Sequence, residues 1–132
     1  MGQVVADASA ITDFIVAGSR STPFDGHLTG AYDLHAPEVC DVEVLSAVRR
    51  GLVSGSLSEP DARRLMLDYA TMPLQRHRHL PLLGRAFELY PNIIAADAMY
   101  VVLAERLDAT LLTADRRLAR AVMRHTAVPV VS

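Results

Sequence analysis

Four carboxylic acids in this chain of 132 residues stand where solvent-exposed acids are unusual. They are Asp7, Glu43, Asp97 and Asp115. Asp7 and Asp115 each come at or just after the end of a short apolar segment, residues 3–6 and 109–113 respectively. Such segments read as strands, and a carboxylate at the end of a strand is well placed for acid–base or metal-ion chemistry.

The other two acids lie within predicted helices. Glu43 is in a stretch that is apolar almost all round, and its own face carries Val39, Cys40, Ser46 and Ala47. A solvated Glu normally has polar neighbours on its face, so we expect Glu43 to enter a pocket. Asp97 lies on the inward stripe of its helix, one turn before Tyr100.

Convergence of the four acids would require a cation. Two carboxylates about 5 Å apart repel each other by roughly 3 kcal/mol at an effective dielectric constant near 20. No His or Cys accompanies the acids in the sequence, so the predicted ligand set contains only oxygen. Hard Mg²⁺ or Mn²⁺ ions suit such a site better than Zn²⁺ does.

Each acid also has a purely structural explanation. Asp is a preferred helix cap, so Asp97 and Asp115 could serve as caps only. Asp7 could belong to a turn, and Glu43 could face solvent if its helix face is misjudged. The joint pattern favours a shared site over these separate explanations.

The elements that must position the acids alternate along the chain. We expect strands at residues 3–6, 33–36, 109–113 and 127–131, with Pro129 indicating an edge strand. We expect helices at residues 8–17, 38–51, 80–90, 95–107 and 115–124, and one more after a capping box at Ser58. Gly51 is the expected end of the second helix. The expected inward residues are Ala62, Leu65, Met66, Tyr69, Leu83, Ala86, Phe87, Tyr90, Tyr100, Ala104 and Leu107.

Alternating strands and helices are typical of a small parallel sheet covered on both faces. Ligands bind such sheets at the carboxyl ends of the strands, where the strand order reverses. Asp7 and the segment 113–115 both fall at strand ends. The predicted fold therefore places these residues at the expected ligand site.

Basic residues offer a local attraction for phosphate. All thirteen are Arg, and Arg116, Arg117, Arg120 and Arg124 form a stripe on the helix that Asp115 opens. Phosphate contact is one interpretation of this stripe, and a solvated face is the other. Arg49, Arg50, Arg76 and Arg78 are weaker candidates. His77 and His79 read as solvated loop residues, and Cys40 as a small buried side chain.

Composition excludes several classes of protein. Hydrophobic residues make up 51% and charged residues 21%, which excludes a disordered chain. Net charge is −2, so no global field draws the protein to nucleic acid. The single Cys excludes an internal disulfide and a Cys-based zinc site. No apolar run reaches the roughly 18 residues of a membrane span, so we expect a soluble cytoplasmic protein.

Four segments together resemble the PIN-domain family, and within it the VapC-type toxins of toxin–antitoxin pairs. They are VVADASA (residues 4–10), HAP (35–37) leading to EVLSAVRR (43–50), ADAMYVVLAE (96–105) and LLTADRRLA (111–119). The resemblance covers essentially the whole chain in the right order, so residues 1–132 are expected to form one PIN domain. This sequence departs from the usual pattern of the family at Ile94 and Ala96, just before Asp97, the third acid.

The resemblance implies a three-layer α/β/α sandwich with a small, mainly parallel sheet. It implies a Mg²⁺-dependent endoribonuclease, with Mn²⁺ as a possible substitute, whose catalytic acids are Asp7, Glu43, Asp97 and Asp115. Asp7 and Asp97 match the direct metal ligands, and Ser9 and Thr113 match polar positions of the same pocket. The implied partners are an RNA substrate and a VapB-type antitoxin that neutralises the toxin. A homodimer is expected from the family and from the frequency of two-fold assemblies.

Two other function classes stay open. A metal-dependent phosphohydrolase of the haloacid dehalogenase type would need a second Asp two residues after the first, and Ser9 stands there. A non-toxic or inactive PIN-fold RNA-binding module would be favoured by a missing acid, and none is missing. RNA cleavage by the purified protein, with and without divalent metal, separates these classes.

Overall fold

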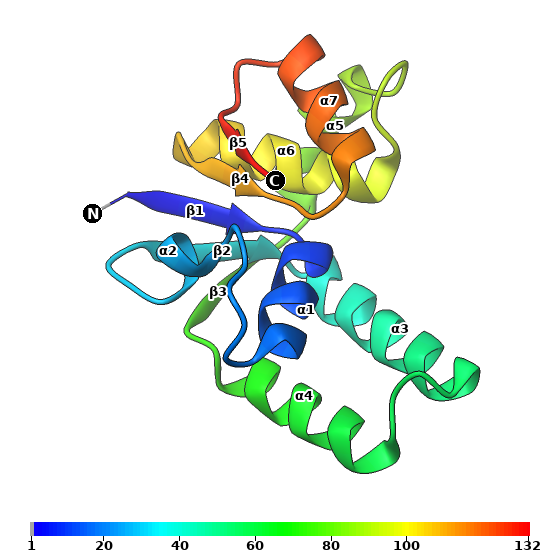
Figure 1. Ribbon diagram of the computed structural model, residues 1–132. Helices are drawn as coiled ribbons and strands as arrows, with labels where there is room; N and C mark the ends of the chain where they lie inside the picture. The colour runs from blue at the N-terminus through cyan, green and yellow to red at the C-terminus, as the bar shows by residue number, and fades with distance from the viewer. Residues whose placement is uncertain (1) are drawn as a thin grey trace.

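A sheet of five parallel strands, in the order β3-β2-β1-β4-β5, forms the centre of the fold. The computed structural model describes residues 2–132 and shows helices flanking this sheet (Figure 1). The strands are β1 (Gln3–Ala6), β2 (Asp33–Pro37), β3 (Leu74–His77), β4 (Thr110–Leu112) and β5 (Val130–Val131). The helices are α1 (Ala8–Ala17), α2 (Asp25–Leu28), α3 (Val39–Ser54), α4 (Glu59–Thr71), α5 (Leu83–Glu88), α6 (Ala95–Leu107) and α7 (Arg116–His125), with a 3₁₀ turn at Leu80–Leu82. This architecture confirms the predicted α/β/α fold class.

The middle strand β1 is apolar because both of its faces are covered. Val4, Val5 and Ala6 have no solvent exposure. On one side of the sheet α1, α3 and α4 pack on one another, and α6 packs against β1, β2 and β4 with α5 beside it (Figure 1). Because both faces are buried, strands in parallel sheets usually do not alternate between polar and apolar residues.

The strand order reverses at β1. The chain moves from β1 through β2 to β3 on one side, and then returns to place β4 and β5 on the other side. The carboxyl ends of β1 and β4 therefore lie next to each other at the reversal. The backbone N–H of Asp7 donates to the Leu112 carbonyl at 3.0 Å and so extends the pairing of these two strands.

The predicted end of the second helix at Gly51 is wrong. The helix α3 continues to Ser54, and Gly55 ends it in the left-handed conformation at φ 79°. Gly51 instead serves packing, since a Cβ there would lie 3.0 Å from Leu57 Cβ. Its missing side chain makes room for Leu57 and does not break the helix.

The predicted loop that contains His77 and His79 is wrong at His77, whereas His79 does lie in a loop, between β3 and the 3₁₀ turn. His77 belongs to the edge strand β3, and its Nε2 lies 2.9 Å from Nδ1 of buried His35 on β2. His79 Nε2 accepts the backbone N–H of Val39 at 3.0 Å, at the start of α3. Both imidazoles thus tie β3 and the segment after it to neighbouring elements.

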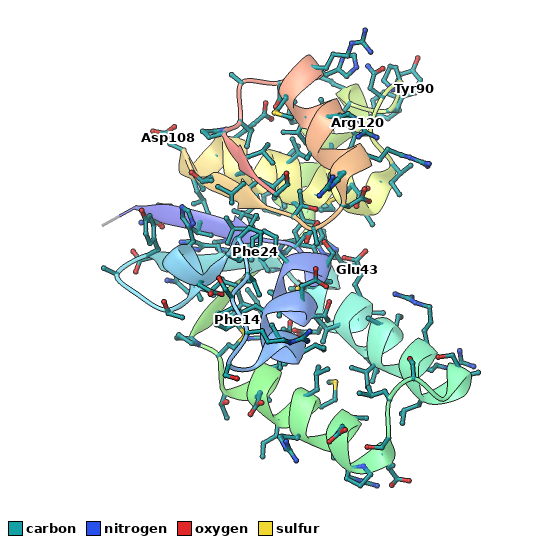
Figure 2. All side chains as sticks on the ribbon, in the orientation of Figure 1. Phe14, Phe24, Glu43, Tyr90, Asp108 and Arg120 are labelled. Carbon is teal, nitrogen blue, oxygen red and sulfur yellow. The ribbon has the colours of Figure 1, made fainter. Side chains whose placement is uncertain are left out.

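The predicted helix over residues 80–90 begins as a 3₁₀ turn and has a different inward face. Leu82, Ala86 and Leu89 are buried, whereas Leu83, Phe87 and Tyr90 are exposed. Figure 2 shows Tyr90 projecting outward from the molecule. Ala86 is the one predicted inward residue of this helix that the structure buries.

Other predicted inward positions are confirmed. Ala62, Leu65, Tyr69, Tyr100 and Ala104 are buried, and Met66 and Leu107 are partly buried. Cys40 is fully buried, as expected. No helix within residues 2–132 is both long and apolar enough to span a membrane.

Candidate active site

Asp7 is a buried carboxylate that links β1 to α1. Its Oδ1 accepts hydrogen bonds from the Ala10 backbone N–H at 2.9 Å and from Ser9 Oγ at 2.6 Å. Its Oδ2 accepts a hydrogen bond from Thr113 Oγ1 at 2.5 Å. Burial raises the pKa of Asp7, these hydrogen bonds oppose the rise, and the charge of Glu43 adds to it. Asp7 therefore caps α1 and also belongs to a cluster of acids.

The segment after β4 is joined to Asp7 through two hydroxyl groups. Fully buried Thr113 donates to Asp7, and its Oγ1 accepts the backbone N–H of Asp115 at 3.0 Å. Ser9 Oγ accepts the backbone N–H of Ala114 at 2.9 Å. Ser9 and Thr113, which the sequence suggested as pocket residues, thus fix the ends of β1 and β4 relative to each other.

Asp115 caps α7 with one oxygen of its carboxylate. Its Oδ1 accepts the backbone N–H groups of Arg117 and Leu118, at 2.9 and 3.1 Å. Asp115 is therefore a helix cap, as the structural alternative predicted. Asp115 nevertheless also lines the cavity described below.

Glu43 is held from the opposite side of the site by Tyr100. Glu43 lies about one turn into α3 and is partly exposed (Figure 2). The hydroxyl of Tyr100, a buried residue of α6, donates to Glu43 Oε1 at 2.6 Å. This contact joins α3 to the helix that carries Asp97.

Asp97 lies in the first turn of α6 but does not cap it. The N-cap residue is Ile94, and within residues 2–132 no protein group donates a hydrogen bond to the Asp97 carboxylate. Burial raises the pKa of Asp97 to about 6, helped by the negative charges of Asp7, Glu43 and Asp115. The capping alternative therefore does not account for Asp97.

All four acids line one cavity of about 460 Å³ at the carboxyl ends of β1 and β4. The other lining residues are Ala8, Ser9, Thr12, Asp13, Ser46, Ala47, Arg50 and Tyr100. Ser46 and Ala47 are the small side chains that the sequence placed on the face of Glu43. The fold therefore brings together the four acids and the small residues that the sequence analysis placed beside Glu43.

Some residues offered as substrate contacts lie elsewhere. Arg116, Arg117 and Arg120 are exposed on α7, outside the set of residues lining the cavity, and Figure 2 shows Arg120 on that helix. Arg50, which sequence reasoning ranked as a weaker candidate, does line the cavity. It follows Glu43 by seven residues, two helical turns, and that spacing was the available signal.

Tyr100 was interpreted from the sequence as a core residue only. It is buried, but its hydroxyl reaches the cavity and contacts Glu43, 57 residues away. No local pattern signals a contact at that separation.

The donor set fits a hard divalent cation. It consists of carboxylates alone, and the pKa values of Asp7 and Asp97 are raised mainly by burial, with the charges of neighbouring acids adding to the rise. Among residues 2–132, no three Asp, Glu, His or Cys side chains already lie at the spacing of a metal-ligand set. Mg²⁺ is commonly held by one or two carboxylates and keeps several waters, so a compact cage is not required.

Comparison with known proteins places the chain in a family. Residues 4–122 match the family described as PIN domain. The chain belongs to the PIN-domain family. Ribonuclease VapC1 of Mycobacterium tuberculosis is 36% identical over 123 residues, 92% of this chain and 92% of that protein. Ribonuclease VapC12 of the same organism is 30% identical over 129 residues, 98% of this chain and 99% of that protein.

Solved structures show the same PIN fold. PAE2754 from Pyrobaculum aerophilum superposes with a TM-score of 0.70 at 19% identity, covering 98% of this chain and 83% of that one. Mycobacterium tuberculosis VapC20, described as a sarcin–ricin loop cleaving toxin, has a TM-score of 0.63 at 12% identity, covering 89% of this chain and 94% of that one. The resemblance to the PIN-domain family that the sequence motifs carried is thereby confirmed.

Proposed function

We propose that the protein is a divalent-metal-dependent endoribonuclease and the toxin of a toxin–antitoxin pair. The observation that carries this proposal is the meeting of Asp7, Glu43, Asp97 and Asp115 in one cavity at the strand-order reversal. The VapC ribonucleases that resemble the chain over nearly its whole length support the same activity.

Asp7 and Asp97 are the proposed direct ligands of Mg²⁺ or Mn²⁺. When bound, such a cation supplies a Lewis acid for the phosphate oxygens and an acidified water. Asp7 is already fixed by three donors, whereas Asp97 accepts none from the described residues and can turn toward a cation. Loss of the cation leaves the two acids to repel each other in a partly dry site.

Glu43 and Asp115 complete the proposed machinery from two sides of the cavity. Glu43 reaches in from α3 and would orient the attacking water or the waters around a cation. Asp115 presents its carboxylate from the start of α7, where two backbone N–H groups hold one of its oxygens. Arg50 at the cavity supplies a cationic contact for the RNA backbone.

The proposed antitoxin would enter along a groove that continues from the acidic cavity. A neighbouring depression of about 260 Å³ shares Thr12, Asp13 and Ala47 with the cavity and extends to Leu57 and Leu65. A third depression of about 240 Å³ continues from Leu57 and Leu65 along α4. An apolar segment lying in this path could carry an Arg to the acids, where its fork would bind two carboxylates.

A homodimer is the other proposed assembly. Leu83 and Phe87 on α5 and Tyr90 in the turn after it are exposed, and the Phe87 and Tyr90 rings stack with centroids 5.7 Å apart. Light scattering on the purified protein, compared with a Phe87→Ser variant, tests whether this face joins two copies. A monomer at all concentrations would contradict the assembly and leave the catalytic proposal intact.

Cleavage of RNA by the purified protein tests the activity. We expect cleavage with Mg²⁺ or Mn²⁺, none in EDTA, and none with Asp7→Asn, together with a higher melting temperature in metal. A hundredfold excess of metal over its dissociation constant stabilises the fold by about 2.7 kcal/mol. Cleavage that survives EDTA, with a melting temperature that ignores metal, would refute the proposal.

A further inference from the structure

Tyr100 makes the one hydrogen bond that the Glu43 carboxylate accepts from the described residues. Its hydroxyl oxygen lies 2.6 Å from Glu43 Oε1, and its ring is 1% exposed. A Glu side chain has three rotatable bonds, so a single anchor of this kind decides where the carboxylate points. The tyrosine itself is held by the core on α6, one turn from Asp97.

The four acids differ in how they are held. Asp7 accepts three hydrogen bonds and Asp115 accepts two from the α7 backbone. Both are therefore fixed by the start of a helix. Glu43 lies inside α3, away from any free backbone N–H, and depends on a side chain from another element.

The tyrosine also stays a donor at every working pH. Burial raises its pKa far above the usual value, and the neighbouring Cys40 and the bond to Glu43 raise it further. A neutral phenol can donate its one O–H to a carboxylate, whereas water would compete for that carboxylate in its absence.

We propose that Tyr100 is a positioning residue that holds the Glu43 carboxylate in the cavity at the distance and angle that RNA cleavage needs. This inference rests on the proposed function, since it assigns Glu43 a part in that reaction. It predicts that loss of one hydroxyl group, with the ring retained, disables Glu43 without disturbing RNA binding.

The chain contains a matched control for this loss. Tyr69 on α4 is 3% exposed, and its hydroxyl donates to Asp41 of the same helix α3 at 2.5 Å. Both tyrosines neighbour the buried thiol of Cys40. Tyr69 is not among the residues that line the acidic cavity, so Tyr69→Phe removes a partly buried hydrogen bond to α3 on the structural side only, at an acid that Arg76 also contacts.

The experiment compares wild type, Tyr100→Phe and Tyr69→Phe in melting temperature, kcat, KM and Mn²⁺ affinity, the last by electron paramagnetic resonance of free Mn²⁺. We expect similar losses of melting temperature in both variants. Only Tyr100→Phe should lower kcat, by about tenfold, with KM within about twofold, as for loss of a hydrogen bond to a charged group. Its Mn²⁺ affinity should also fall, by up to about tenfold, because Glu43 would hold waters around the cation and loses its anchor.

A second route breaks the same contact from the other end. Glu43→Asp shortens the acid by one methylene, so its carboxylate no longer reaches the Tyr100 hydroxyl, and it leaves the core ring in place. We expect the same losses of kcat and Mn²⁺ affinity, and no further loss when Tyr100→Phe is added. If Tyr100→Phe does not fold, Glu43→Asp still tests the inference, because full activity in this variant would show that the contact is not needed.

Full kcat and Mn²⁺ affinity in Tyr100→Phe or in Glu43→Asp would overturn the inference. Equal losses of kcat in Tyr100→Phe and Tyr69→Phe would also overturn it, because they would indicate general loosening of α3. If wild type does not cleave RNA, the proposed function fails. The positioning role then stands only if Tyr100→Phe, and not Tyr69→Phe, weakens Mn²⁺ binding.

Discussion

Replacing Asp97 by Asn should stabilise the metal-free protein. The pKa of Asp97 is raised from 3.8 to about 6 by burial and by the negative charges of Asp7, Glu43 and Asp115. Between these two values the folded state holds a proton that the unfolded state releases. The free energy of unfolding therefore falls as pH rises from about 4 to about 6, and levels off above.

The size of this effect follows from the pKa. Each pH unit between the folded and unfolded pKa values corresponds to about 1.4 kcal/mol, so the full effect is about 3 kcal/mol. Water in the open cavity screens part of it, and we expect about 2 kcal/mol above pH 7. That gain corresponds to roughly 8 °C in melting temperature for a domain of this size. Asn mimics the neutral acid and so removes the unfavourable charge.

Urea unfolding in EDTA between pH 4 and pH 8 measures the effect. Asp97→Asn should match wild type near pH 4 and exceed it increasingly toward pH 7. Asp13→Asn, which removes an exposed charge from the same cavity, should change stability by less than about 0.5 kcal/mol throughout. Addition of Mn²⁺ should stabilise wild type and leave Asp97→Asn unchanged. An Asp97→Asn protein no more stable than wild type at pH 7 in EDTA would refute the reasoning.

Three further outcomes are expected. Arg50→Ala should raise KM for RNA and weaken its salt dependence, while Arg49→Ala, the adjacent exposed residue outside the cavity, should change neither. The contribution of His35 to stability should decline as pH falls below 6.5, because burial and the neighbouring His77 lower the pKa of His35, opposed by Asp33. In a urea series, the stability of wild type relative to His35→Gln should therefore fall as pH is lowered. Asp115→Asn should keep the melting temperature and lose cleavage, whereas Asp115→Ala should lose cleavage and about 1 kcal/mol of stability.

Much of the fold could be predicted because local signals and tertiary structure agree. The strand 3–6 and the helix 8–17 are found at the predicted bounds, since an apolar run ends at a capping Asp. The helix 95–107 is likewise confirmed, with Tyr100 and Ala104 buried. The strand at 74–77 was missed because an edge strand with Gln75 and Arg76 exposed carries no alternating pattern.

The α5 segment shows why periodicity can choose the wrong face. Two stripes have the same helical spacing: Leu82, Ala86, Leu89 and Ile93 on one face, and Leu83, Phe87, Tyr90 and Ile94 on the next. The structure buries the first stripe and exposes the second. Hydrophobicity alone cannot choose between them, because the exposed stripe is the larger and more aromatic. The 3₁₀ turn at Leu80–Leu82 sets the phase, and its pitch differs from that of the helix that follows.

The acids of the candidate site were easier to predict from the sequence than the residues that hold them by hydrogen bonds. Four acids could be named from strand ends and helix faces, and all four line the cavity. Their hydrogen-bond partners were only partly evident. Ser9 lies two residues from Asp7, but the Thr113 and Tyr100 contacts span 106 and 57 residues. Contacts at such separations depend on the strand order, which the local sequence does not record.

Capping and catalysis are not competing explanations for these acids, because a carboxylate has two oxygens. Asp115 uses Oδ1 for both α7 backbone donors, which leaves Oδ2 without a donor among the described residues and available to the cavity. Asp7 is held more fully, with two donors on Oδ1 and one on Oδ2, so Oδ2 is the oxygen that keeps a lone pair for a cation. Asp97 differs from both: no group among the described residues donates to it, and burial, followed by the charges of Asp7, Glu43 and Asp115, raises its pKa to about 6. In the proposed function, the acids held at helix starts would form a rigid frame, and Asp97 would be the ligand free to turn toward a cation.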